Sequence, residues 1–273
     1  MKILITGSRG FIGQHLIVTL KAEGHDVIEV SRQTGVDFNH MVETSDWLPL
    51  LETVDVVINC VGIIVENKQQ SFNNLHTRAP SALFKACEQA GVTRVIQVSA
   101  LGADEKAFTP YQLSKKAADD VLRNLPLEWF ILRPSLVYGE GGASTRFFKK
   151  LAKFPVLALV NGGNQYIQPV HIMDLVDVVR TCLTAQPANK TIDVVGPQAM
   201  TFAQWIQRLR YESGKAGAFI IPVPYKGMLF ISYLLHFCIP LLHPDNLRML
   251  QQGNSSEDKS MSQLLGREAR VLP

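Results

Sequence analysis

The sequence predicts an α/β protein built on a doubly wound parallel sheet, and three observations support this prediction. Short β-rich runs alternate with helix-length stretches along the first half of the chain. Several runs, such as VDVVIN and RVIQVS, are apolar almost throughout, as strands covered on both faces require. A turn with regularly spaced glycines follows the first run and opens a helix. Strand–helix alternation of this kind is typical of a parallel sheet with helices on both faces.

The expected elements follow one another in order. The expected strands are Lys2–Thr6, Asp26–Ser31, Val54–Asn59, Arg94–Ser99 and Glu128–Leu132. The expected helices are Phe11–Glu23, Ser71–Ala90 and Gln112–Asn124. After about residue 140 the alternation loosens, and Gly and Pro gather in GEGGAS, NGGNQ and VGPQ. We therefore predict a core domain over 1–140; over 141–273 we expect the remaining core elements, interleaved with a small C-terminal substrate lobe, in one compact unit.

Composition narrows the class of protein. A chain of 273 residues with 47% apolar residues can fill a sizeable core. The net charge is only +3, from 27 Lys+Arg against 24 Asp+Glu, and charged residues make up 19% of the chain. Bulk charge therefore does not favour a polyanion, and we expect no nucleic-acid partner.

The cysteines and the N-terminus indicate the cellular compartment in which the protein is expected. The four cysteines are scattered without a C-x-x-C pair, at Cys60, Cys87, Cys182 and Cys238. This pattern predicts neither a metal site nor a disulfide framework and fits a reducing compartment. The first apolar run is also much shorter than the stretch of about 7–15 residues that a secretory signal needs. We expect a cytoplasmic protein.

The glycine turn TGSRGFIG predicts a phosphate site. Gly7 permits a tight turn, Gly10 lets the backbone approach a pyrophosphate, and Gly13 lets the helix pack closely on the strand. The N-terminus of the helix offers free N–H groups to the anion. Glycines also serve ordinary turns, but this strand–turn–helix context favours a dinucleotide on a Rossmann-type sheet. The predicted contacts are Gly7, Ser8, Arg9, Gly10, Phe11, Ile12 and Gly13.

The end of the second expected strand favours NADP over NAD. An acidic residue there would accept a hydrogen bond from a ribose 2′-hydroxyl, but this chain has Ser31 and Arg32. Arg32, helped by Arg9, can contact a 2′-phosphate. The alternative is that both arginines are ordinary surface charges and that the cofactor is NAD.

A tyrosine and a lysine form the candidate catalytic pair. Tyr111 and Lys115 are four residues apart and share one face of the helix that begins near Pro110. A nearby cation favours the phenolate, which predicts a lowered pKa for Tyr111. Ser99, at the carboxyl edge of the sheet, could hydrogen-bond a carbonyl oxygen. Alone, the Tyr-x-x-x-Lys spacing also fits two surface residues.

Five stretches together carry a family resemblance: TGSRGFIG, VSALGA, YQLSK, LRPSLVYG and QPVHIMDL. In these the chain resembles the short-chain dehydrogenase/reductase superfamily, on its extended or atypical side, where the NAD-dependent epimerases and dehydratases lie. The resemblance covers essentially the whole chain. The tail, PDNLRMLQQGN followed by a short LLG segment, is similar to the branch related to the 39 kDa nucleotide-binding subunit of respiratory complex I.

The resemblance implies a bound NAD(P) and a Ser-Tyr-Lys constellation carried by Ser99, Tyr111 and Lys115. It also implies that Lys115 holds the nicotinamide ribose. Asp37, after a presumed third strand, takes the place where members contact adenine. Further cofactor contacts are expected at Cys60, Val61, Gly62, Pro134 and Ser135.

Two residues depart from the family pattern. Ala100 stands where extended members carry a second hydroxyl residue, and His76 stands where an asparagine is common. Nucleotide binding is therefore better supported than turnover, and two functions stay open. One is an NADP-dependent oxidoreductase or epimerase/dehydratase acting on a carbonyl or alcohol carbon of a small molecule. The other is a non-catalytic nucleotide-binding scaffold or assembly factor of a membrane complex resembling complex I.

The mean hydropathy of the chain is slightly positive, +0.09, and the most apolar stretch is 219–242. We expect no membrane span there, because polar and helix-breaking residues interrupt it at Pro222, Pro224, Lys226, Gly227 and Pro240. A helix over an apolar substrate pocket and a helix docked on a partner are the favoured interpretations, with plain core packing as the alternative. Peripheral contact with a membrane is less favoured, because the segment lacks a strongly basic face.

Overall fold

Six parallel strands form the central sheet, in the order β10-β5-β4-β3-β1-β2. The strands are β1 (Lys2–Thr6), β2 (Asp26–Val30), β3 (Val56–Asn59), β4 (Arg94–Val98), β5 (Glu128–Pro134) and β10 (Lys190–Val194). The computed structural model describes residues 1–236 and 239–271. It confirms the predicted α/β fold with a doubly wound parallel sheet, and the expected strands lie within two residues of the observed ones.

Contacts group the described residues into two units. The first unit holds Met1–Pro134, Ile172–Val194 and Asp258–Arg267. The second holds Ser135–His171, Val195–Glu257 and 268–271. The chain therefore leaves the first unit at the end of β5 and returns to it at Ile172, before β10.

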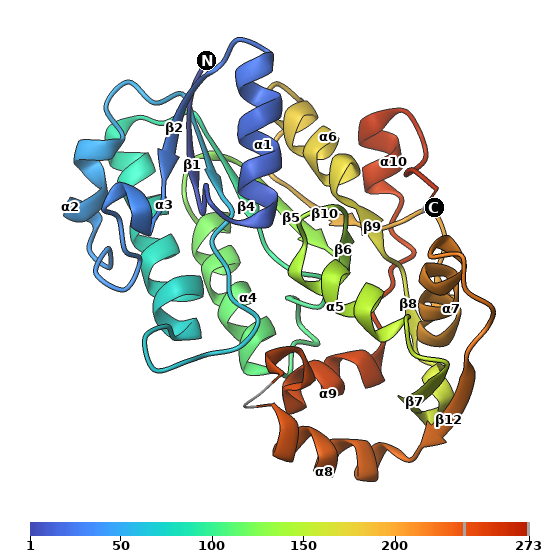
Figure 1. Ribbon diagram of the computed structural model, residues 1–273. Coiled ribbons are helices and arrows are strands. Elements are labelled where there is room, and N and C mark those ends of the chain that lie inside the picture. Colours follow the sequence, from blue (N-terminus) through green and yellow to red (C-terminus); the bar gives the residue numbers. More distant parts are fainter. Residues whose placement is uncertain (237–238, 272–273) are drawn as a thin grey trace. The chain divides into compact units, whose positions relative to one another are not determined.

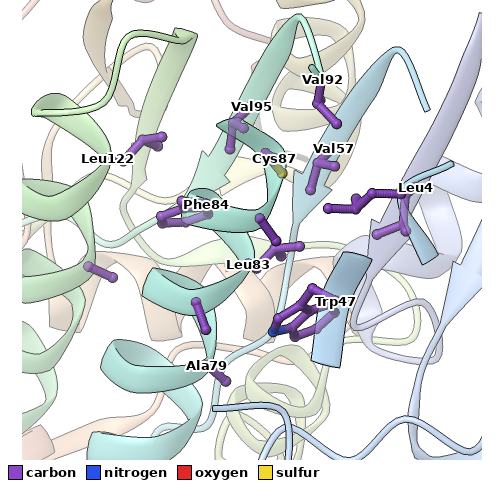
Figure 2. Close-up of a cluster of buried hydrophobic side chains, with 14 of the residues drawn as sticks. Leu4, Trp47, Val57, Ala79, Leu83, Phe84, Cys87, Val92, Val95 and Leu122 are labelled. Atoms are coloured by element: carbon purple, nitrogen blue, oxygen red, sulfur yellow. The ribbon is translucent and has the colours of Figure 1, made fainter. Parts of the chain in front are cut away.

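Helices cover both faces of the sheet in the first unit (Figure 1). They are α1 (Phe11–Ala22), α2 (Thr44–Trp47), α3 (Ala79–Ala90), α4 (Pro110–Arg123), α6 (Ile172–Cys182) and α10 (Ser260–Leu265). On one face α3 packs between α2 and α4, and on the other α6 packs between α1 and α10. Figure 2 shows the first of these layers, where Leu83 and Phe84 of α3 meet Leu4, Val57 and Val95 of the sheet.

The switch in strand order fixes where a ligand can bind. The chain runs from β1 out to β2, and then continues on the other side of β1 with β3. Parallel sheets bind ligands beyond the carboxyl ends of their strands, at the point where the order reverses. That point lies between β1 and β3, so it includes the glycine turn after β1 and the loop after β3.

Local sequence signals start α4 at a definite residue. Thr109 caps the helix by accepting a hydrogen bond from Gln112 N, and the Gln112 side chain completes a capping box. Pro110 occupies the first turn, where its missing N–H costs nothing. These signals fix the rotation of α4, which carries Tyr111 and Lys115.

The second unit is built from short two-stranded pairs and helices. β7 (Val156–Val160) pairs with β12 (Phe219–Val223), β8 (Tyr166–Ile167) with β11 (Met200–Thr201), and β6 (Val137–Tyr138) with β9 (Val170–His171). Its helices are α5 (Ala143–Leu151), α7 (Phe202–Glu212), α8 (Tyr225–Leu235) and α9 (Pro244–Gln252). Its core gathers around the fully buried Trp205.

The remaining helical segments are single turns. Short 3-10 turns occur at Arg32–Thr34, Leu48–Leu50, Asn161–Gly163 and Pro240–Leu242, and a π-helical turn, Asn73–Arg78, leads into α3. No helix within 1–236 or 239–271 combines the length and the apolar character needed to cross a membrane. Cys238 and part of the apolar stretch lie outside the described residues.

Candidate active site

The glycine turn has the geometry that its sequence predicts. Gly7 adopts a φ of +67°, and a Cβ there would lie 2.9 Å from the carbonyl carbon and oxygen of Cys60. A Cβ on Gly13 would lie 2.4 Å from Gly7 O. The backbone therefore reverses tightly after β1, and α1 packs against the turn at a distance that only glycine permits.

Polar groups left open at this edge fit a dinucleotide. Gly10 is the N-cap of α1 and provides no side chain to cap the helix, so the amides of the first turn are available to an anion. Within the described part of the chain, the buried hydroxyl of Ser8 and the hydroxyl of Ser31 have no hydrogen-bond partner. These residues follow β1 and β2, where a pyrophosphate and a ribose need such groups.

Arg9 and Arg32 are both exposed, and neither forms an ion pair with a described residue. The hydrogen bond from Lys21 holds the pKa of Glu29 below its usual range, and the charge of Arg9 adds a smaller part. Arg9 therefore lies near β2. Two guanidinium groups thus remain available beside the open hydroxyl of Ser31.

Asp37 does not follow a third strand, which corrects the sequence prediction. A 3-10 turn, Arg32–Thr34, takes the place of that strand, and Gly35 at a φ of +87° reverses the chain after it. Local hydrogen bonds from Thr34 to Ser31 compete with strand pairing here. Asp37 instead accepts hydrogen bonds from the backbone and side chain of Asn39.

Lys115 is buried at the carboxyl ends of two strands. Its Nζ donates to Val61 O at 3.0 Å and to Val98 O at 3.1 Å, which leaves one N–H of the ammonium free for another partner. A Cβ on Gly62 would lie 3.2 Å from this Nζ. Burial lowers the pKa of Lys115 to about 8, although the charge of Asp119 opposes the shift.

Tyr111 lies one helical turn before Lys115, and two rings enclose it. Its ring centroid is 5.8 Å from that of Phe72 and 5.5 Å from that of His76, both edge to face. Burial raises the pKa of Tyr111 to about 12, and the charge of Asp119 adds to the rise. The structure thus reverses the expected lowering by Lys115, because removal from water outweighs the attraction of a cation that is bonded to two carbonyls.

Ser99 is buried, and its hydroxyl donates to Oδ2 of Asp119. This bond directs the Ser99 proton into the protein rather than toward a substrate oxygen. Burial raises the pKa of Asp119 to about 6, while the bond from Ser99 and the charge of Lys115 act against the rise. Our sequence analysis missed Asp119, although the spacing 111, 115 and 119 places all three residues on one face of α4.

A row of buried polar side chains continues from Asp119 across the sheet. Thr6, Asn59 and Gln97 are register partners on β1, β3 and β4. Thr6 Oγ1 donates to Asn59 Oδ1, and Asn59 Nδ2 donates to Gln97 Oε1 at 2.7 Å. The row connects the glycine-turn strand with the site on α4.

Comparison with known proteins assigns the chain to a family. A model described as "NAD dependent epimerase/dehydratase family" matches residues 3–195. This chain belongs to that family. The match covers the glycine turn, α4 and the six strands of the central sheet apart from Lys2, so the resemblance noted from the sequence is confirmed.

Curated relatives include a reductase and a mitochondrial NADH dehydrogenase subunit. Ceramide reductase from Caulobacter vibrioides is 30% identical over 184 residues, which are 63% of this chain and 57% of that protein. Mitochondrial NADH dehydrogenase (ubiquinone) 1 alpha subcomplex subunit 9 of Mus musculus is 26% identical over 238 residues, 81% of this chain and 62% of that protein. The chain therefore spans less than two thirds of the length of these relatives.

Solved structures share the fold. UDP-glucuronic acid 4-epimerase from Bacillus cereus, in complex with UDP-glucuronic acid and NAD, has a TM-score of 0.74 at 20% identity and covers 100% of this chain and 95% of its own. The dTDP-4-dehydrorhamnose reductase from Bacillus anthracis, in complex with NADP, has a TM-score of 0.70 at 16% identity, over 82% of this chain and 84% of its own. Both cofactors thus occur among proteins of this fold.

His76, which stands where the resemblance implies an asparagine, hydrogen-bonds to two other segments of the protein. Its Nε2 accepts from Ile63 N at 3.0 Å, so its Nδ1 carries the proton and donates to Ser114 Oγ at 3.0 Å. Burial lowers the pKa of His76 to about 2, with a smaller contribution from Lys115. His76 is therefore a neutral link between the loop after β3 and α4.

The other predicted cofactor contacts lie at strand ends. Cys60, Val61 and Gly62 form the loop after β3, and burial raises the pKa of the Cys60 thiol to about 12. Pro134 ends β5 and accepts from Leu101 N at 2.9 Å. Ser135 begins the second unit, where its hydroxyl donates to Gln168 O.

The described residues contain no candidate metal site, and two grooves found among them do not extend the site of Tyr111 and Lys115. Among the residues the structure describes, no group of His, Cys, Asp and Glu side chains could hold a metal ion. A groove of about 630 Å³ in the first unit is lined by residues such as Glu23, Arg180 and Arg267. A groove of about 940 Å³ in the second unit is lined mainly by amide and hydroxyl side chains. Neither includes Tyr111 or Lys115.

Proposed function

We propose that the chain is an NADP-dependent oxidoreductase or epimerase/dehydratase that acts on a carbonyl or alcohol carbon of a small molecule. The observation that carries the proposal is the placement of Tyr111 and Lys115 at the carboxyl ends of β3 and β4, beside the glycine turn. The nicotinamide, when bound, supplies or accepts the hydride. The residues of the chain then transfer the proton and stabilise the negative charge that forms.

In the reducing direction Tyr111 gives its hydroxyl proton to the substrate oxygen while the carbon receives the hydride. A pKa of about 12 keeps this hydroxyl protonated at neutral pH. The buried Lys115 ammonium stabilises the tyrosinate that forms, and its free N–H is available to the ribose of the cofactor. Ser99 orients the substrate oxygen only when its O–H leaves Asp119.

The Tyr111→Phe variant tests the enzymatic function. Removing the proton donor should lower turnover by about 10²–10⁴-fold on any accepted substrate, with NADPH affinity nearly unchanged. Candidate substrates are UDP-sugars and ceramide-like lipids, because similar proteins are named a UDP-glucuronic acid 4-epimerase and a ceramide reductase. Full activity in the variant would overturn the assignment of Tyr111.

The choice of NADP rests on the unpaired Arg9 and Arg32 and on the absence of an acidic residue at the end of β2. Arg32→Ser should weaken NADPH binding about tenfold or more and leave NADH binding nearly unchanged. Arg146→Ser removes the same charge from the second unit and serves as the control. Tighter binding of NADH than NADPH to the unmodified chain would overturn the choice.

A second candidate is a non-catalytic nucleotide-binding scaffold of a membrane complex. Similarity to a complex I subunit over 81% of the chain supports it without favouring it, and Ala100 and the bond that occupies Ser99 are consistent with it. We propose a cytoplasmic location for either function. If the scaffold function is right, Tyr111→Phe leaves assembly of the complex intact in cells, whereas Gly13→Ala impairs it by distorting the nucleotide turn.

A further inference from the structure

The second unit carries an apolar surface that its own described residues leave uncovered. Phe154 precedes β7 and Val156 begins it, and both are exposed. On the paired strand β12, Phe219 is 70% exposed and Ile221 is also exposed. Because β7 and β12 are hydrogen-bonded neighbours, these side chains from distant parts of the sequence lie on one small sheet.

Helix α8 extends this surface and is arranged with its apolar side outward. Phe230 is 66% exposed and Leu234 is 62% exposed, while the buried residue of the helix is Ser232, at 3%. A helix of a soluble domain normally buries its apolar stripe and exposes its polar face. α8 packs against β7, so the helix and the strand pair form one continuous apolar surface.

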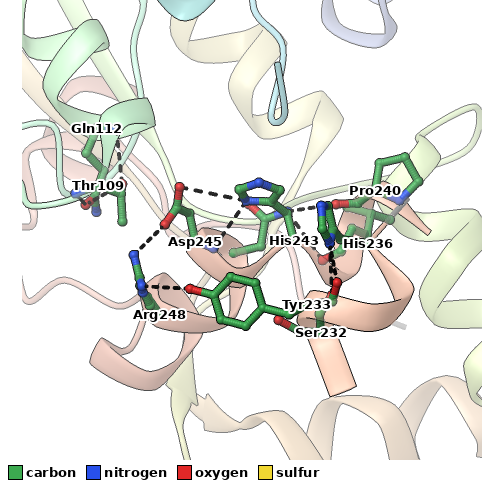
Figure 3. Close-up of polar contacts among 11 residues, drawn as sticks. Thr109, Gln112, Ser232, Tyr233, His236, Pro240, His243, Asp245 and Arg248 are labelled. Atoms are coloured by element: carbon green, nitrogen blue, oxygen red, sulfur yellow. Dashed lines mark hydrogen bonds and ion pairs between the residues drawn. The ribbon is translucent and has the colours of Figure 1, made fainter. Parts of the chain in front are cut away.

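Polar contacts hold α8 in this orientation. Arg248 of α9 donates to the hydroxyl of Tyr233 at 3.3 Å and pairs with Asp245 at 3.0 Å (Figure 3). The helix is thus bonded to α9 through polar groups. Its exposed leucine and phenylalanine side chains can therefore contact an apolar surface outside this unit.

The segments of the sequence that contain this surface carry charges of one sign. Residues 143–160 and 213–236 include no Asp or Glu. Their six basic residues are Arg146, Lys149, Lys150, Lys153, Lys215 and Lys226. Glu212, the acidic residue that borders the second stretch, is bonded to the hydroxyl of Tyr138. An apolar surface whose own segments carry only basic charges matches an anionic lipid surface, where each basic residue contributes about 1 kcal/mol.

We propose that this surface, formed by the exposed side chains of β7, β12 and α8, docks the protein on the face of an anionic lipid bilayer. A second copy of the chain fits less well, because a two-fold contact would bring two basic surfaces together. Docking in the interface needs no helix long enough to span the bilayer, which agrees with the helices described.

Vesicle flotation of the full chain tests the proposal. The protein should float with vesicles that contain phosphatidylglycerol and stay unbound with phosphatidylcholine alone. Raising the ionic strength from about 0.1 M to about 1 M should release it, since the screening length falls from about 10 Å to about 3 Å. Failure to bind the anionic vesicles at low salt overturns the proposal.

Paired variants separate the apolar and the electrostatic parts. Phe230→Ser with Leu234→Ser should lower the partition coefficient about tenfold or more, and Lys150→Glu with Lys153→Glu should do the same. Controls of matched chemistry are Val18→Ser on α1 and Lys85→Glu on α3, both at exposed positions of the first unit.

Light scattering on the same samples tests whether a second copy of the chain covers the surface instead of a lipid bilayer. The proposal expects one oligomeric state for the unmodified chain and for Phe230→Ser with Leu234→Ser. A dimer that dissociates in that variant would assign the surface to a second copy and overturn lipid docking. Equal loss of vesicle binding in the control variants would also overturn it.

Discussion

At the scale of single residues, three side chains on one face of α4 are coupled through burial. Lys115 is bonded to two backbone carbonyls, Tyr111 lies against two rings, and Asp119 accepts from Ser99. Burial disfavours the charged form of each group, so it lowers the pKa of Lys115 and raises those of Tyr111 and Asp119. Desolvation is therefore the largest cause of the pKa shifts of these three groups, and charges and hydrogen bonds nearby contribute less.

The lowered pKa of Lys115 predicts a pH-dependent stability. The folded chain binds fewer protons than the unfolded chain between about pH 8 and 10.5. The cost of burying the ammonium is therefore fully present below pH 8 and disappears as the pH rises through this window. The free energy of unfolding of the unmodified chain, minus that of Lys115→Met, should rise by about 3 kcal/mol across it.

Urea unfolding of both chains at several pH values measures this difference. Lys116→Met is the matched control, because the hydrogen bonds that Lys116 donates to Asp120 and Glu105 raise its pKa. Its difference should fall, not rise, as the pH increases through the folded pKa. A flat difference for Lys115→Met would mean that Lys115 is neutral or solvated in the folded chain.

At the scale of elements, two helical glycines differ in the space available for a side chain. A Cβ on Gly13 of α1 would meet Gly7 O at 2.4 Å, whereas a Cβ on Gly227 of α8 would make an ordinary 3.7 Å contact with Val223. Gly13→Ala should lower the free energy of unfolding by about 2 kcal/mol or more, since backbone must shift. Gly227→Ala should raise it by about 0.5–1 kcal/mol, as alanine favours helix.

Denaturant midpoints and NADPH titration of both variants check this contrast. Loss of NADPH binding should accompany Gly13→Ala alone, because the displaced turn is the predicted phosphate site. If Gly13→Ala is as stable as the unmodified chain, the close packing of α1 on the turn is wrong.

At the scale of the whole molecule, the two units are assigned different tasks. The glycine turn, the loop after β3 and the active face of α4 all belong to the first unit. The apolar surface of β7, β12 and α8 belongs to the second. The nucleotide and the lipid should therefore protect different parts of the chain.

Hydrogen exchange measures this separation. Saturating NADPH should slow exchange in peptides covering 5–14, 59–63 and 111–116 and leave 219–236 unchanged, since bound ligand stabilises the segments it contacts. Anionic vesicles should protect 154–160 and 219–236. Equal protection of 219–236 by NADPH would favour a role for that segment in covering the ligand.

The sheet, the glycine turn and the placement of Tyr111 and Lys115 on α4 could be predicted from the sequence. Each of these depends on local spacing: alternation of strand and helix, glycines at a strand end, and residues four apart on a helix. The strand expected before Asp37 failed because hydrogen bonds between Ser31 and Thr34 turned the chain locally.

The tertiary structure alone decided which way the pKa values move and what surrounds the apolar stretch. Ser99 reaches Asp119 across 20 positions of sequence, and desolvation of Tyr111 depends on rings from another helical turn. The pairing of β7 with β12 brings Val156–Val160, which follow a basic stretch of the sequence, beside Phe219–Val223. Burial and long-range contact are properties of packing, and local spacing does not encode them.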